Sequence, residues 1–191
     1  MIIYPSIIET TGRSTKAYDL PTKLLQSRIV YLAGEINEEV ANIIIMQMLW
    51  LNADNPEIPI DFYINSPGGA VYDGLAIKDI IYNLQCKVNT IGVGVCASMA
   101  AYLLASGTGV RKATENTRIM IHSVSGGSTG SIQDMQVDYK ETKFLQDLMV
   151  RDLMKFTKGK SSKRNINSKV ERDYYMDVKE AIKMGLIDEK V

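Results

Sequence analysis

Apolar residues alternate along the chain between the spacing of strands and the spacing of helices. Short runs rich in β-branched side chains predict strands at residues 28–33, 58–65, 88–95, 110–113 and 118–121. Longer runs with helical spacing predict helices at residues 38–51, 71–84, 97–105, about 131–156 and 178–184. Strands that alternate with helices through short connections indicate an α/β fold. Its parallel sheet should have right-handed crossovers and sites at the carboxyl ends of its strands.

Two segments have neither the strand nor the helix spacing of apolar residues. Residues 1–19 are polar, with a Thr-Gly-Arg-Ser cluster, and predict a mobile arm or loop. Residues 158–169 are basic and rich in serine, which predicts a solvated linker, although a nucleic-acid patch is the other interpretation. We expect one domain over residues 20–191, because a chain of 191 residues supports one sizeable core.

Composition narrows the class of protein. The chain is 46% hydrophobic and 23% charged, and 22 basic residues balance 22 acidic ones, so no net field favours nucleic acid. No apolar run approaches the roughly 18 to 20 residues of a membrane span. The opening residues lack the pattern of a signal peptide, which predicts a cytoplasmic protein. Cys86 and Cys96 make neither a disulfide framework nor a metal site, and no cofactor is expected.

One serine lies where a predicted strand passes directly into a helix of small residues. Ser98 follows the strand at residues 88–95 and begins the helix that ends at Ala105. Unpaired N–H groups and the positive end of the helix dipole would stabilise an oxyanion there, so Ser98 is a candidate nucleophile. The alternative interpretation is an ordinary helix N-cap. Cys96, two residues earlier in the buried strand, is a weaker candidate.

The remaining parts of a hydrolytic site also follow strands. The pair Gly68-Gly69 comes after the strand at residues 58–65 and can present N–H groups outward. His122, the only histidine, ends the strand at residues 118–121 and could serve as the base. Several aspartates downstream could orient it: Asp134, Asp138, Asp147, Asp152, Asp173, Asp177 and Asp188. Asp177 is better explained as a helix cap, whereas Asp173 lies in a predicted loop that could aim inward.

Four segments carry a resemblance to a known family. They are residues 63–69 (YINSPGG), 97–104 (ASMAAYLL), 118–122 (RIMIH) and 171–176 (ERDYYM). In this order and spacing they resemble the proteolytic subunits of Clp proteases, the ClpP family, over roughly residues 18–190. The resemblance implies a serine endopeptidase with Ser98 as nucleophile, His122 as general base and acid, and Asp173 as its orienting carboxylate. It also implies an oxyanion hole made by the N–H groups of Gly69 and Met99.

The resemblance implies a fold and an assembly as well. The fold would be the ββα superhelix of the ClpP and crotonase type, with residues of about 123–158 forming a long projecting handle. Subunits would assemble into two stacked seven-membered rings, with the arm at residues 1–19 lining the axial pore. Unfolded polypeptide, delivered by an AAA+ ATPase, would bind as an added strand near four residues, Gly68, Ser125, Gly126 and Gly127. No nucleic acid or membrane would be involved.

Two departures from the family pattern bear on these expectations. Ser123 and Val124 follow the histidine, where typical members have a glutamine or similar residue and then proline, so we expect a softer loop. Asp61 and Asn83 occupy aromatic positions of the usual ATPase-docking pocket. Because a buried carboxylate under an apolar anchor is costly, we expect weak docking and hypothesise an accessory paralogue that works with a second ClpP subunit.

Two other classes of function remain open at this stage. The first is a structural or regulatory ring subunit that is inactive alone and contributes mainly to assembly. The second is an acyl-CoA enzyme of the crotonase type, which shares the fold and holds a thioester enolate with paired backbone N–H groups. The latter would not require the serine, histidine and aspartate together, so their presence favours the peptidase.

Overall fold

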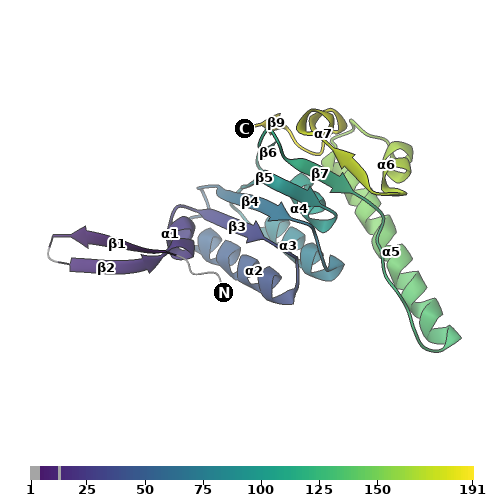
Figure 1. Cartoon of the computed structure of the whole chain (residues 1–191), viewed down its shortest axis with the longest axis horizontal. Coiled ribbons are helices and arrows are strands. Elements are labelled where there is room, and N and C mark those ends of the chain that lie inside the picture. Colours follow the sequence, from purple (N-terminus) through teal and green to yellow (C-terminus); the bar gives the residue numbers. More distant parts are fainter. Residues whose placement is uncertain (1–4, 13) are drawn as a thin grey trace.

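A mostly parallel, seven-stranded sheet forms the centre of the computed structural model, which describes residues 5–12 and 14–191. Its main path runs through β3 (Ile29–Ala33), β4 (Ile60–Ser66), β5 (Val88–Ala97), β6 (Arg111–Ala113) and β9 (Glu189–Lys190). Off this path, β7 (Arg118–Ile121) pairs in parallel with β5, and β8 (Tyr174–Met176) pairs antiparallel with β7. The predicted α/β fold with a parallel sheet is confirmed (Figure 1).

The described residues also form seven helices. They are α1 (Leu20–Gln26), α2 (Glu38–Asp54), α3 (Val71–Asn83), α4 (Met99–Ala105), α5 (Ile132–Phe156), α6 (Lys163–Val170) and α7 (Val178–Met184). Every residue of α4 is buried, and its three alanines allow neighbouring elements to pack closely against it. In contrast, α5 extends beyond the sheet, and its 25 residues confirm the long helix predicted at about residues 131–156 (Figure 1). None of the helices described is long and apolar enough to cross a bilayer.

A bend in β5 carries the sheet toward the site. The first half of β5 pairs with β6 and its second half with β7, and its register with β4 shifts between Ile64 and Ser66. Gly94 has a φ of 66° at this point, and a Cβ there would lie 2.9 Å from Oδ1 of Asn65. Only glycine fits this close approach, so the bend follows directly from the sequence.

The amino-terminal segment differs from its prediction. We expected an irregular arm over residues 1–19, but β1 (Ser6–Thr11) and β2 (Ser14–Asp19) pair as an antiparallel hairpin that extends away from the sheet (Figure 1). Residues 1–4 and 13 of the predicted arm lie outside the described residues. The hairpin's side chains are nearly all exposed, so its strands are held by backbone pairing and lack the apolar alternation that predicts a strand.

The basic segment after α5 also differs from its prediction. Half of the expected linker at residues 158–169 belongs to α6, whose N-cap Ser162 accepts a hydrogen bond from the N–H of Asn165. Ile166 and Val170 are its buried residues. Two apolar residues among lysines were too weak a pattern to reveal a helix that tertiary packing stabilises. The loop predicted around Asp173 leads directly into strand β8, which begins at Tyr174.

Candidate active site

Ser98 occupies a strained turn between β5 and α4. Its φ and ψ are 56° and −122°, outside the regions that residues with a Cβ usually adopt, which costs of order 1–3 kcal/mol. The serine N–H donates to the carbonyl of Met120 at 2.8 Å, which helps to hold this conformation. Its side chain makes no capping hydrogen bond to α4. Ser98 therefore occupies the N-cap position of α4 without the side-chain hydrogen bond of an ordinary N-cap.

The histidine lies between the serine and one of the aspartates. Nε2 of His122 is 2.8 Å from Oγ of Ser98, and Nδ1 is 3.0 Å from Oδ1 of Asp173. A carboxylate cannot donate, so it accepts from Nδ1–H and leaves the Nε2 lone pair facing the serine hydroxyl. This tautomer is the one that can remove the hydroxyl proton. The structure thus brings together the three side chains that the sequence predicted to act together.

Sheet register explains why Asp173 is the aspartate beside His122. In the antiparallel pair β7 and β8, Ile121 lies opposite Tyr174, so the residues just outside these positions, His122 and Asp173, face each other. The other candidate aspartates make no hydrogen bond to His122 among the described residues. Asp134 and Asp177 cap helices, and Asp138, Asp152 and Asp188 bind Ser128, Tyr102 and Arg111.

The two glycines before α3 support the turn at Ser98. An isolated parallel bridge joins Gly69 to Ile36: the N–H of Ile36 donates to the Gly68 carbonyl, and the N–H of Ala70 donates to the Ile36 carbonyl. Neither bond uses the N–H of Gly69, which is left for another acceptor. Met99 begins α4, so its N–H belongs to the first turn, where helices lack internal acceptors.

Both glycines are required by close contacts. Gly68 has a φ of 100°, and a Cβ on it would lie 2.8 Å from the Cβ of Ser98. Gly69 has a φ of 152°, and its added Cβ would lie 2.1 Å from the Ile36 carbonyl oxygen. These contacts exclude any side chain, because real Cβ atoms do not approach so closely. The Gly68-Gly69 turn therefore positions backbone groups at Ser98.

A small cavity of about 50 Å³ opens beside the serine. It is lined by residues from several elements: Gly69, Val71, Ser98, Met99, His122, Ser123, Val124, Ser125 and Met149. Of the predicted substrate residues, Ser125 borders this cavity, while Gly68 lies buried beneath the serine turn. Gly126 and Gly127 line a separate hollow of about 190 Å³ against α5. The predicted substrate-binding segment therefore spans two adjoining spaces.

Sequence inspection missed Gln146, Val71 and Met149. Val71 and Met149 line the cavity, and the side-chain oxygen of Gln146 accepts a 2.7 Å hydrogen bond from the N–H of Val124. Gln146 lies in the middle of a charged helix, where no sequence signal distinguishes it from a solvated residue. Its role depends on the path of the loop after His122, which only the tertiary structure defines.

Cysteine and metal chemistry have no comparable arrangement in residues 5–12 and 14–191. Cys96 is fully buried, its Sγ donates to the carbonyl of Ile64, and burial raises the pKa of its thiol to about 12. Such a thiol stays neutral near pH 7 and is a poor nucleophile. In the same described ranges, no group of three or more histidine, cysteine, aspartate or glutamate side chains is placed to hold a metal ion.

Comparison with protein families agrees with this arrangement. The family model described as Clp protease matches residues 12–191, which is nearly the whole chain. The matched region contains the sheet, the turn at Ser98 and the strands that carry His122 and Asp173. The chain belongs to the Clp protease family.

Proposed function

We propose that the chain is a serine endopeptidase subunit in which Ser98, His122 and Asp173 form the catalytic triad. The supporting observation is the continuous hydrogen-bonded chain from Oγ of Ser98 through both ring nitrogens of His122 to Asp173. It lies beside a cavity that Gly69 and Met99 also line. An acyl-CoA enzyme of the same fold would have no use for this proton path, so the peptidase is favoured.

The reaction begins with acylation of the serine. Oγ of Ser98 attacks the carbonyl carbon of the peptide bond while Nε2 of His122 takes the hydroxyl proton. The N–H groups of Gly69 and Met99 donate to the oxyanion of the tetrahedral intermediate. His122 then passes its proton to the leaving amine, and the C–N bond breaks. Asp173 stabilises the imidazolium through Nδ1–H during both transfers.

Hydrolysis of the acyl-enzyme uses the same groups in reverse. Water enters where the amine has left, and Nε2 of His122 removes its proton as the oxygen attacks the ester carbon. The second oxyanion forms in the same hole. Collapse of this intermediate returns the proton to Oγ of Ser98 and releases the carboxylic acid product.

An extended polypeptide is the substrate that best suits the surroundings. The segment Ser125, Gly126 and Gly127 leads away from the cavity and has no partner strand in the sheet. Backbone pairing with such a segment tolerates many side chains, as degradation of unfolded proteins requires. Gly68 acts indirectly, because it supports the serine turn.

Assembly into rings is the second part of the proposal. Exposed apolar side chains on α2 include Ile43, Met46, Leu49 and Trp50, and those on α5 include Ile132, Val137 and Phe144. Ile43, Met46 and Trp50 have the i, i+3 and i+7 spacing of one helix face, and an exposed apolar face indicates protein contacts. We assign the α2 surface to neighbours within a seven-membered ring. The projecting half of α5 would be the handle that joins two rings, with the hairpin β1–β2 at the pore.

ATP would be used by a partner, because the sequence contains no phosphate-binding loop of the Walker type. An AAA+ unfoldase would deliver substrate to the rings in the cytoplasm. Asp61 bears on its docking: Oδ1 accepts from Nδ2 of Asn89 at 2.8 Å, within a hollow of about 320 Å³ that Tyr63 also lines. An apolar anchor there would desolvate this carboxylate.

This observation favours a second candidate function, that of an accessory paralogue that scaffolds or acts only with a second ClpP subunit. Asn83, at the exposed end of α3, adds polarity where an aromatic residue is usual. Capture of a Clp ATPase by the pure homo-oligomer separates the two candidates. Strong capture would contradict the accessory role, whereas capture only by a mixed complex supports it.

Labelling with a fluorophosphonate tests the peptidase directly. We expect the assembled protein to form one adduct on Ser98, found by peptide mass spectrometry, and to cleave a short fluorogenic peptide. The Ser98→Ala variant should do neither while keeping its size in gel filtration. An assembled protein that takes no label, alone or with a second subunit, would overturn the proposal.

A further inference from the structure

Asp173 depends on its backbone for its position. Its side chain is 60% exposed, and within the described part of the chain His122 is its only hydrogen-bond partner. It stands just before β8, a strand of only three residues. An exposed carboxylate on a short strand end has many rotamers and much water to compete for it, so something must fix the start of β8.

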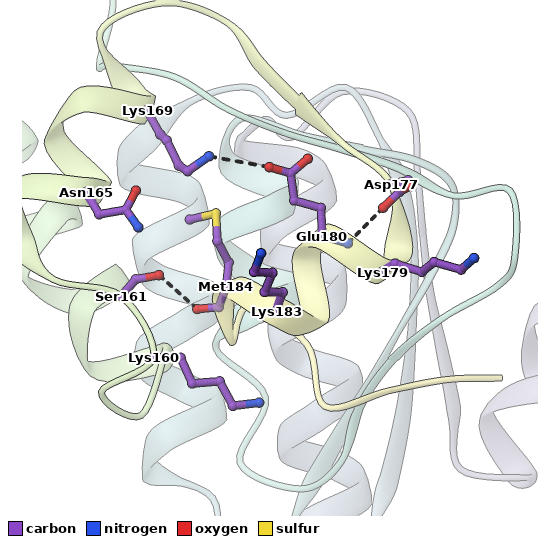
Figure 2. A pocket seen from close by; sticks show the side chains of 9 residues that line it. All are labelled: Lys160, Ser161, Asn165, Lys169, Asp177, Lys179, Glu180, Lys183 and Met184. Carbon is purple, nitrogen blue, oxygen red and sulfur yellow. Dashed lines mark hydrogen bonds and ion pairs between the residues drawn. The ribbon is translucent and has the colours of Figure 1, made fainter.

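Tyr174, the next residue, is held by a polar cluster. Its hydroxyl donates to Oε1 of Glu180 on α7, and Nζ of Lys169 on α6 lies 3.5 Å from the centre of its ring. Lys169 also lies 3.4 Å from Oε1 of Glu180 (Figure 2). These contacts connect α6, β8 and α7 at the side chain of Tyr174, the residue that follows Asp173.

Glu180 is itself fixed in place. Its N–H donates to Oδ1 of Asp177, the N-cap of α7, at 2.8 Å (Figure 2). A hollow of about 550 Å³ borders the cluster through Lys169 and Glu180. Tyr174 is also partly buried and packs against the hydrophobic core. The polar contacts restrain the hydroxyl end and the ring of its side chain.

We propose that Tyr174, Glu180 and Lys169 are positioning residues for Asp173. By anchoring Tyr174 opposite Ile121, they hold Asp173 within hydrogen-bond reach of His122 Nδ1. None of the three contacts the reacting atoms. The inference rests on the proposed peptidase function, since it concerns how that triad is kept aligned.

Kinetics of matched tyrosine variants test this role. Tyr174→Phe keeps the ring and loses the hydroxyl, and should lower kcat about 3- to 10-fold with KM unchanged, because alignment and not substrate binding is affected. Tyr175→Phe is the control, since Tyr175 is the next residue and 53% exposed. It should retain full kcat. Equal effects of the two variants would overturn the proposal.

Variants of the acceptor provide a rescue. Glu180→Leu should lower kcat as Tyr174→Phe does, whereas Glu180→Gln keeps an oxygen for the tyrosine hydroxyl and should recover most of the loss. In an Asp173→Asn background, Tyr174→Phe should cause no further decrease, because both changes act through one carboxylate. A further decrease of the same size would contradict the inference.

A measurement independent of activity separates this inference from the proposed function. His122 is the only histidine, so in protein without a histidine tag its ¹⁵N imidazole signals are unambiguous. We expect the Nδ1–H tautomer in the unmodified chain and a mixture of tautomers in Tyr174→Phe. If the unmodified chain neither cleaves peptide nor takes label, the proposed function fails while this test still applies. An unchanged tautomer with lower thermal stability would show a merely structural role and overturn the inference.

Discussion

The backbone N–H of Val124 donates a 2.7 Å hydrogen bond to the side-chain oxygen of Gln146, in the middle of α5. Val124 also lines the cavity beside Ser98, two residues after His122. The bond therefore connects the loop that follows His122 to the long helix. It restrains the position at which the family resemblance implies proline, which is a residue without an N–H. The hydrogen bond therefore restrains the loop after His122 at Val124, where the sequence led us to expect greater flexibility.

Loss of the hydrogen bond between Val124 and Gln146 should lower peptidase activity only where residue 124 has an N–H to donate. Gln146→Leu should lower kcat/KM roughly 3- to 10-fold, because the Val124 N–H loses its partner in a partly buried place. Gln146→Glu keeps an acceptor and serves as the control. In a Val124→Pro background there is no donor, so Gln146→Leu should have little effect. Equal losses in both backgrounds, measured by peptide hydrolysis, would show that Gln146 acts in another way.

Substitution of the orienting carboxylate should reduce turnover strongly. Asp173→Asn keeps the shape but can no longer support the imidazolium, so kcat should fall by on the order of 10²- to 10⁴-fold. Asp147→Asn, an exposed aspartate on α5, is the control and should retain kcat. Steady-state kinetics at saturating peptide measure this. A loss below about threefold in Asp173→Asn would remove Asp173 from the triad.

A methyl group at Gly69 should abolish activity, whereas one at Gly34 should not. Both residues have positive φ, but the added Cβ meets the Ile36 backbone only at Gly69. Gly34→Ala therefore isolates the cost of the backbone conformation, about 1 kcal/mol. Gly69→Ala should show no detectable labelling of Ser98 by a fluorophosphonate. Normal labelling would mean that the turn at Gly68-Gly69 tolerates displacement and does not build the oxyanion hole.

The buried ion pair of Arg111 should make stability fall at acid pH. Arg111 donates to Asp188 and to the carbonyls of Ala105 and Phe156, at the ends of α4 and α5. Its hydrogen bonds to Asp188 are the main reason why the pKa of that carboxyl lies well below its ordinary value. Because the pKa is lower in the folded state, the ionised Asp188 contributes fully to folding stability above about pH 4. This contribution declines as the pH falls further.

Variants can isolate this contribution. Asp188→Asn should destabilise the fold by roughly 3–5 kcal/mol near neutral pH, because a buried guanidinium loses its counter-charge, and should flatten the dependence of stability on pH below about pH 4. Glu189→Gln removes one partner of the exposed pair with Lys112 and should change stability by less than about 1 kcal/mol. Chemical denaturation at each pH, at one protein concentration, measures both. An unchanged acid dependence in Asp188→Asn would assign it to other carboxylates.

Alkylation should leave the activity of the folded protein intact. Cys96 has a pKa of about 12 because of burial, and Cys86 is also buried with a raised pKa. Iodoacetamide needs a thiolate, so neither residue should react within hours near pH 7. Mass spectrometry gives the extent of modification, and unfolded protein is the positive control. Loss of peptidase activity together with alkylation of Cys96 would support the cysteine as nucleophile instead of Ser98.

The elements that carry the chemistry were predictable because their signals are local. Apolar spacing defined the strands that end before Gly68, Ser98 and His122, and parallel pairing then required their ends to meet at one edge. In contrast, β8 and β9 have three and two residues, and their stability comes from pairing with β7 and β6. The apolar pattern of the sequence did not predict these two strands.

For Ser98, the sequence predicted the position in the fold, whereas tertiary contacts impose the backbone conformation. Its place between a strand and a helix was clear from the sequence, together with the only histidine and the paired glycines. Its positive φ, which turns Oγ away from capping and toward His122, depends on the Met120 carbonyl and on Gly68 packing beneath it. Contacts between distant segments impose that conformation, so no local rule predicts it.

Among the aspartates, the sequence pattern left several partners open for His122, and mainly the family resemblance pointed to Asp173. The register of Tyr174 against Ile121 makes the choice in the folded chain. That register needs β7 and β8, separated by α5 and α6, to meet as neighbours. Local pattern therefore determined which residues could perform the chemistry. Pairing between strands far apart in the sequence, which depends on the whole fold, decided which of them meet.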